Sequence, residues 1–227
     1  MDDYRYIRND ITELTEGLPL YHSILSAIAL GDGKEHAVFK RANVSQSVGR
    51  GAIEALVEKK IIQIHKVKTH DDRFYFTTPF LHFWFAFVSP LFKGVRDGDY
   101  SEVKKRWENY AHDFFAEAFS RLARDMVKKM LTEEKVMRVM PLYTENEMFD
   151  LFVESKSDTT ILGTIKYTNA KLKKNELTKL QERAQTANIS ADSYIIVAKK
   201  GFSSELKALK GEKLKLFTLK NFKVLVE

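Results

Sequence analysis

Two short segments of the sequence place polar side chains at a spacing that suits phosphate chemistry. Asp150 and Glu154 lie four residues apart in one alternating segment, and Thr164 and Lys166 lie two apart in the next. Because successive side chains of a β-strand point to opposite faces, each pair would share one face of its strand. If the two strands form a hairpin, Asp150 comes opposite Thr164 and Lys166. A carboxylate-bound divalent cation can activate water, and a lysine can stabilise the developing charge, so this pattern suits phosphodiester hydrolysis.

Other kinds of catalytic site find little support in the sequence. There is no cysteine, which excludes disulfides, thiolate zinc sites and cysteine nucleophiles. The six histidines show no H-x-x-x-H or H-E-x-x-H spacing, and no G-x-S-x-G or G-x-x-x-x-G-K-[ST] motif occurs. We therefore expect no helical zinc site, no serine hydrolase and no ATP hydrolysis by this chain alone.

Apolar and charged residues are distributed as in a cytoplasmic protein. The longest apolar segment, residues 74–92, is interrupted by threonine, serine, histidine and proline, and residues 1–8 lack a basic segment followed by an apolar one. We expect no membrane partner. The net charge of +6 lies mainly in the second half, where Lys171, Lys173 and Lys174 form a basic cluster close to Lys166. Such a cluster favours contact with phosphate.

The first 95 residues show the pattern of a winged helix. Apolar residues recur at helical spacing in 18–29, 35–41 and 45–57, with Ser45 placed to cap the third helix, and strand-like segments follow at 61–68 and 73–77. In a winged helix the third helix and the hairpin face DNA. The candidate contacts are Gln46, Ser47, Arg50, Lys66, Lys68 and Arg73. Winged helices also dock proteins, so both roles stay open.

The remaining sequence predicts a connection and a second domain. Residues 79–90 are aromatic without any Lys or Arg, which favours a buried core over a base-stacking surface. Gly94–Asp99 reads as a linker, so we expect domains at 1–95 and 96–227. The second domain would contain one or two long helices at 100–131 and then strands at 136–139, 148–153, 160–167, 193–198 and 214–219, with helices at 175–187 and 204–209. Overall the chain is expected to be α+β or α/β with a mixed sheet.

Three segments in order resemble the C-terminal part of archaeal-type, AAA-like ATPases. They are Tyr75-Phe-Thr-Thr-Pro-Phe-Leu-His-Phe-Trp-Phe-Ala-Phe, the 110–122 helix with Phe115-Ala-Glu117, and Asp150 followed by Gly163-Thr-Ile-Lys-Tyr-Thr-Asn169. The resemblance spans residues 18–220. It implies a winged helix followed by a PD-(D/E)XK nuclease-like domain. Because the ATPase domain of that family has no counterpart here, it also implies either an ATPase partner acting in trans or a chain that has lost the ATPase.

The sequence departs from the nuclease pattern at two positions. Thr164 stands where the second metal-binding carboxylate belongs, and Ala116 stands where the helix should carry an acid, with Glu117 one position later. One position turns a side chain by about 100°. Asp150 alone would be a weak metal ligand, so we expect no cofactor and a nucleic-acid-binding or partner-docking protein that does not cleave.

Three alternatives remain. The chain could be a DNA nuclease that uses Mg²⁺ or Mn²⁺ with Asp150, Lys166 and a carboxylate from Glu117 or Glu154. It could be a protein-interaction scaffold for an ATPase. Asp150 and Lys166 could also form a simple surface ion pair.

Overall fold

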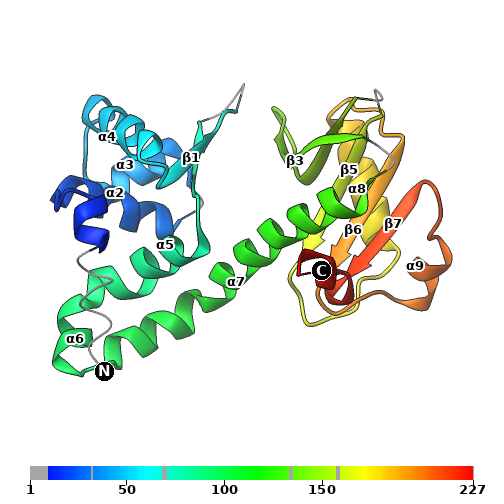
Figure 1. The fold of residues 1–227 in the computed structure, drawn as a ribbon. Coiled ribbons are helices and arrows are strands. Elements are labelled where there is room, and N and C mark those ends of the chain that lie inside the picture. The colour runs from blue at the N-terminus through cyan, green and yellow to red at the C-terminus, as the bar shows by residue number, and fades with distance from the viewer. Residues whose placement is uncertain (1–9, 32, 68–70, 133–134, 157–158, 227) are drawn as a thin grey trace. The chain divides into compact units, whose positions relative to one another are not determined.

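A computed structural model describes residues 10–31, 33–67, 71–132, 135–156 and 159–226. The chain divides into two units, residues 1–111 and 112–227. Helices and a two-stranded sheet make up the first unit, and a five-stranded mixed sheet with helices makes up the second (Figure 1). The expected mixture of helices with a mixed sheet is confirmed. No helix in the described part of the chain is both long and apolar enough to span a membrane.

The first unit begins with three helices and a hairpin. The helices are α2 (Pro19–Ala29), α3 (Glu35–Ala42) and α4 (Gln46–Glu58), and the strands β1 (Ile62–His65) and β2 (Arg73–Phe76) pair antiparallel. The hydroxyl of Ser45 accepts a hydrogen bond from the Val48 backbone N–H, which confirms the expected cap.

Helix α4 buries Ala52, Ile53 and Leu56 of its apolar face, but its first turn departs from that pattern. Val48, which lies at helical spacing from these residues, is 50% exposed, whereas Gly49 is buried. A Cβ atom at Gly49 would lie 2.5 Å from the ring of Phe39. The glycine therefore lets that ring approach the helix backbone, and this close packing turns Val48 outward.

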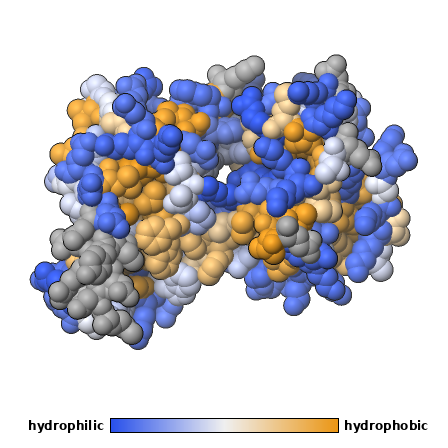
Figure 2. Space-filling model, in the orientation of Figure 1, coloured by the Kyte–Doolittle hydropathy of each residue, from blue (hydrophilic) through white to orange (hydrophobic). Residues whose placement is uncertain are grey.

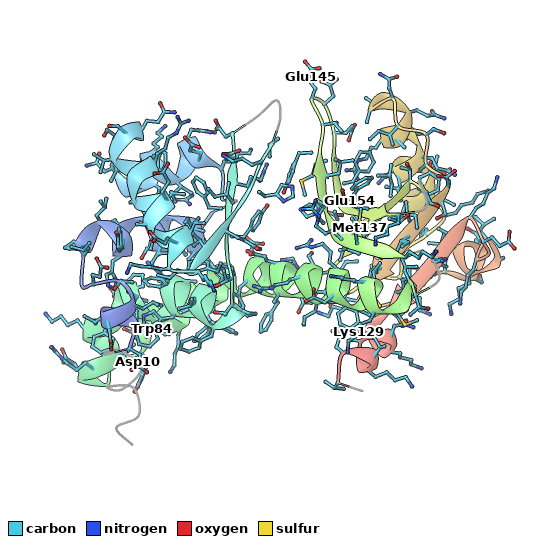
Figure 3. All side chains as sticks on the ribbon, turned by 45° about the horizontal axis from the view of Figure 1, so that its top comes forward. Asp10, Trp84, Lys129, Met137, Glu145 and Glu154 are labelled. Carbon is cyan, nitrogen blue, oxygen red and sulfur yellow. The ribbon has the colours of Figure 1, made fainter. Side chains whose placement is uncertain are left out.

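The aromatic segment that follows contains a change of helix type. It comprises α5 (Pro79–Phe83), the π-helix η1 (Trp84–Val88), the 3₁₀ turn η2 (Ser89–Leu91) and α6 (Phe92–Asp97). Trp84 (labelled in Figure 3) and Phe87 are buried as expected, but Phe80 is 48% exposed and Phe85 is buried. A π-turn inserts an extra residue into the helical repeat, so it changes which side chains face inward.

A buried histidine and the end of α6 complete the description of this region. His82 is buried, with its Nε2 3.0 Å from the carbonyl oxygen of Ala29 and its ring stacked on Phe76. The segment predicted to be a linker is instead mostly α6, ended by Gly98 at φ +79°. A Cβ at Gly94 would lie 2.8 Å from the Asp99 carbonyl oxygen, so that glycine permits a tight helix end.

The second unit is built on one five-stranded sheet in the order β3-β4-β5-β6-β7. Its strands are β3 (Val136–Tyr143), β4 (Met148–Ser155), β5 (Ile161–Lys166), β6 (Ser193–Ala198) and β7 (Leu214–Thr218). β3, β4 and β5 pair antiparallel, and β5, β6 and β7 pair parallel. Its helices are the part of α7 (Ser101–Met130) from residue 112 on, α8 (Asn175–Thr186), α9 (Ser204–Ala208) and the 3₁₀ segment η3 (Leu219–Leu225). Hydrophilic residues predominate on the face of this unit that Figure 2 shows.

Helices cover both faces of this sheet. Phe119, Met126 and Val127 of α7 pack with Ile165 and Val197 on one face. Leu180 of α8 and Leu206 of α9 pack with Leu162 and Ile196 on the other. The end of α7 is tied to η3 by Lys129 (labelled in Figure 3), whose Nζ donates to the Val224 carbonyl oxygen over 3.0 Å.

The apolar pattern of α7 overstates its burial. Trp107, Tyr110, Phe115 and Leu122 lie at the helical spacing typical of a buried face, but all four are exposed. The helix has apolar residues on more than one side, and only the side formed by Phe119, Ala123, Met126 and Val127 meets the sheet.

Candidate functional site

The side chain of Asp150 continues the hydrogen bonding between β4 and β5 beyond the last backbone pair. The two strands pair as far as Leu151 with Gly163. One residue on, Oδ2 of Asp150 accepts hydrogen bonds from the Thr164 hydroxyl (2.8 Å) and from the Ile165 backbone N–H (3.0 Å). The carboxylate thus takes the place of a backbone carbonyl as an acceptor for β5.

Thr164 is buried and donates toward this carboxylate. Its side chain comes from the centre of the sheet, where the residue is only 2% exposed. Because the hydroxyl proton is donated to Asp150, the pair consists of one anionic acceptor and one neutral donor. A carboxylate at the same position would face Asp150 with like charge, which only a cation or a shared proton could relieve.

Lys166 ends β5 and lines a cavity of about 440 Å³. The cavity is formed by the end of β5, the segment that follows it, and α8. Its lining residues are Thr164, Lys166, Thr168, Ala170, Lys171, Leu172, Lys173, Asn175, Glu176, Lys179, Leu180 and Arg183. The volume suits a small polar ligand or part of a larger one.

Positive charge dominates this cavity. Lys179 pairs with Glu176 at 3.5 Å, and Arg183 pairs with Glu147 at 2.9 Å. In the part of the chain that the structure describes, no carboxylate pairs with Lys166, Lys171 or Lys173. Three ammonium groups around one cavity therefore keep their full capacity to bind an anion.

The backbone fixes the two neighbouring lysines of this group. Leu172 is buried between Lys171 and Lys173, and it forms a parallel bridge to Phe202. Its N–H donates to the Gly201 carbonyl oxygen (2.9 Å), and its own carbonyl oxygen accepts from the Ser203 N–H (2.8 Å). Since neighbours in an extended chain alternate in direction, the buried Leu172 directs both lysines away from the core.

The other expected acidic residues lie apart from the cavity lining. Asp150 is not among the lining residues but accepts a hydrogen bond from Thr164, which is. Glu154 pairs with Arg138 of the edge strand β3 at 2.8 Å (Figure 3 labels Glu154). Glu117 lies on α7, about 160° around the helix from the sheet-facing Phe119. Among the described residues, no three His, Asp or Glu side chains are grouped so that they could hold a metal ion.

At α8, one predicted lysine lies outside the cavity lining and three residues that were not predicted lie within it. Lys174 is the N-cap residue of α8 and is not among the residues that line the cavity. Asn175, Lys179 and Arg183 line it although they were not predicted. They are spaced by four residues and so share one face of the helix, a signal that the sequence does contain.

The candidate DNA contacts of the first unit are partly engaged with acids of the same unit. Arg50 Nε donates to Glu35 Oε1 at 2.8 Å, and Lys66 Nζ donates to Asp72 Oδ2 at 2.6 Å. Gln46 and Ser47 are exposed at the start of α4. Arg73 pairs with His65 across the hairpin, and Lys68 lies outside the described residues.

A third contact with an acidic residue involves helix α3 of this unit, through a histidine that is charged only if it is protonated. His36 of α3 contacts Asp71 through its Nδ1. The Arg50–Glu35 and Lys66–Asp72 pairs already compensate two positive charges near α4 and the hairpin within the unit.

Comparison with known proteins gives one partial match. Residues 84–180 match the family model DUF234, described as archaea bacterial proteins of unknown function. The match covers less than half of the chain and includes Asp150, Thr164 and Lys166. No curated protein and no solved structure matches.

Proposed function

We propose that this chain binds nucleic acid through the cavity beside Lys166 and does not cleave it. The observation that carries the proposal is the set of three lysines, Lys166, Lys171 and Lys173, that have no acidic partner among the described residues. Nucleic-acid affinity comes largely from such contacts with phosphate. Thr168 and Asn175 add polar groups that can hydrogen-bond to a phosphate oxygen.

The absence of cleavage in this proposal rests on the neighbours of Asp150. Oδ2 of Asp150 is already an acceptor for the Thr164 hydroxyl and the Ile165 N–H. A Mg²⁺ ion would have to compete with both donors and would gain only one anionic ligand there. No metal cofactor is therefore part of the proposed function.

The proposal includes an ancestral relation to PD-(D/E)XK nucleases and a winged helix in the first unit. It is supported by Asp150 on β4 next to Thr164-Ile-Lys166 on β5, and by three helices followed by a hairpin in residues 19–76. Domains at 1–95 and 96–227 belong to the same proposal. The partial match over residues 84–180 is compatible with it.

The test is the salt dependence of DNA binding by the whole chain in EDTA, measured by fluorescence anisotropy. Each phosphate contact adds about 0.7 to 0.9 to the slope of log affinity against log salt concentration. The Lys171→Ala/Lys173→Ala variant should lower that slope by roughly 1.5 and weaken binding at least about tenfold. The matched control is Lys207→Ala/Lys210→Ala, which removes two exposed lysines away from the cavity. Equal losses in both variants would contradict the assignment.

A metal-dependent nuclease is the second candidate, favoured by the approach of Asp150 to the strand that carries Lys166. It would use Asp150 and Lys166, with Glu117 or Glu154 supplying the missing carboxylate. Incubation of single- and double-stranded DNA with Mg²⁺ or Mn²⁺ tests it. Cleavage that disappears in Asp150→Ala would establish the enzyme, and intact DNA with both metals would exclude it under those conditions.

Docking of a protein partner is the third candidate, and the first unit favours it. The pairs Arg50–Glu35 and Lys66–Asp72 reduce the positive charge that α4 and the hairpin could offer to DNA. An ATPase acting in trans would be the partner. If Arg50→Ala leaves DNA affinity and its salt slope unchanged in a folded chain, Arg50 makes no contact with DNA, as this candidate expects.

A further inference from the structure

An aromatic cluster lies at the end of β5, next to the cavity in sequence. Tyr167 follows Lys166, and its ring centroid lies 5.6 Å from that of His112, 6.5 Å from that of Phe115 and 5.5 Å from that of Phe119. Nζ of Lys199, which follows β6, lies 4.0 Å from the Tyr167 ring centroid. A cation thus lies over an aromatic face.

The cluster extends from the core to the surface. Phe119 is buried and stacks on Phe222, which anchors one side. Phe115 is 41% exposed, and the side chain of His112 is 72% exposed. Phe115 is not among the residues that form the buried core of this unit. Its ring is instead inclined by only 28° to that of Tyr167.

This arrangement matches the requirements for contact with unpaired bases. Proteins that bind single strands combine exposed aromatic rings, on which bases stack, with basic groups that follow the phosphate backbone. Here Phe115, His112 and Tyr167 supply rings, and Lys199 and Lys166 supply cations. In a duplex the base faces are covered by their neighbours, so they are not available for such stacking.

We propose that the second unit binds single-stranded nucleic acid, with a base on Phe115 and Tyr167 and a neighbouring phosphate in the lysine cavity. The inference rests on the proposed nucleic-acid binding and specifies its substrate class. Lys166 is the last residue of β5 and Tyr167 follows it, so their side chains lie on opposite faces of the sheet, Lys166 beside α8 and Tyr167 beside α7. A single strand that passes around the carboxyl end of β5 would reach both groups. His112 and Lys199 border the same ring and contact the base or the backbone.

The experiment compares labelled single-stranded DNA, single-stranded RNA and duplex DNA of the same sequence, binding to the full chain in EDTA. We expect the wild type to bind at least one single strand about tenfold or more tightly than the duplex. Loss of one stacked base weakens binding by about 5- to 150-fold. Phe115→Ala should show such a loss for the single strand and little change for the duplex. Phe80→Ala removes a similarly exposed phenylalanine from the first unit and serves as the control.

A second variant keeps the proposal testable if Phe115→Ala does not fold. Phe115→Trp retains a ring at this position, and its additional fluorescence should be quenched when a single strand is added but not when duplex is added. A comparison of DNA with RNA identifies which strand is preferred.

Each contrary outcome has a distinct meaning. Equal affinity for single strand and duplex, or a Phe115→Ala variant that binds like the wild type, would overturn the single-strand inference while leaving the proposed function intact. Absence of binding to all three nucleic acids would overturn both.

Discussion

The hydroxyl of Thr164 donates to Oδ2 of Asp150 over 2.8 Å, and the Ile165 N–H donates to the same oxygen over 3.0 Å. Oδ2 of Asp150 is therefore already a hydrogen-bond acceptor for β5, and a ligand would have to compete for it. Hydrogen bonds to a charged acceptor contribute about 1.5–3 kcal/mol when buried, and less where water reaches the acceptor.

Thr164→Val should destabilise the second unit by about 1–2 kcal/mol, because it removes one donor from a partly buried carboxylate without changing the side-chain shape. Urea unfolding followed by circular dichroism measures the effect. Thr178→Val, at an exposed position of α8, should stay within about 0.5 kcal/mol of the wild type. If the two variants behave alike, the hydrogen bond has no part in stability.

Thr164→Glu should create a dependence on divalent cations. Two carboxylates at this point repel, so the variant should melt at a lower temperature than the wild type in EDTA. Mn²⁺ should recover much of the loss, since a ligand that binds only the folded state stabilises it. Thermal melts with and without Mn²⁺ provide the measurement, and Thr178→Glu should show no such recovery. If a folded Thr164→Glu variant is not stabilised by Mn²⁺, the result argues against an ancestral metal site at this position.

Arg50→Met should destabilise the first unit by about 1–2 kcal/mol, because it leaves the carboxylate of Glu35 without its partner. The Glu35 side chain is only 10% exposed, whereas that of Arg50 is 60% exposed, and this exposure reduces the cost. Adding Glu35→Gln should recover most of the loss. A double-mutant cycle from urea unfolding gives the coupling energy, and strictly additive effects would show that the pair is not coupled.

The first unit should lose stability as the pH falls below about 6.5. Burial lowers the pKa of His22 below its ordinary value. The unfolded chain then takes up a proton that the folded chain does not, so unfolding is favoured between the usual histidine pKa and the lower folded one. Above that window His22 is neutral in both states and contributes no pH dependence.

The tautomer of His22 follows from its partners. The hydroxyl of Thr15 donates to the Ile11 carbonyl oxygen over 2.8 Å, so it accepts from Nε2 of His22, 3.1 Å away. Nδ1 then accepts from the Ser89 hydroxyl at 3.3 Å. His22→Gln should flatten the stability profile below pH 6.5 while the slope between pH 7 and 8 stays that of the wild type. An unchanged profile below pH 6.5 would remove His22 from the explanation.

Gly163→Ala should destabilise the second unit by about 1–3 kcal/mol, because the added methyl group overpacks the sheet. A Cβ atom there would lie 2.6 Å from the Ile195 carbonyl oxygen of β6. β5 and β6 would have to separate next to Thr164. Gly211→Ala is the control, since its Cβ would meet nothing within 4 Å. The urea unfolding midpoints of the two variants measure this difference in stability.

Much of the second unit could be predicted from the sequence because its strands are strongly apolar. Ser193–Ala198 forms β6 with the bounds that were expected, and the approach of Asp150 to Thr164 follows from strand alternation and a hairpin. The contact of Asp150 with the Ile165 N–H could not be foreseen. It depends on where the ladder between β4 and β5 ends, which a pattern of alternation does not specify.

The errors have physical causes in helix geometry and in contacts distant in sequence. Burial of Phe85 in place of Phe80 requires a π-turn, which apolar periodicity at 3.6 residues cannot indicate. The partner of Arg50 lies fifteen residues away on another helix, so its engagement was invisible in the sequence. Tyr167 meets Phe115 only because α7 packs on the sheet.

The backbone bridge between Leu172 and Phe202 has a practical consequence for handling the protein. It holds the backbone of Lys171 and Lys173 beside the cavity that Lys166 also lines, so the three like charges that border it repel one another. Any small multivalent anion relieves that repulsion. Phosphate or sulfate buffer should therefore raise the melting temperature above that in chloride of equal ionic strength, and should compete with nucleic acid in every binding assay.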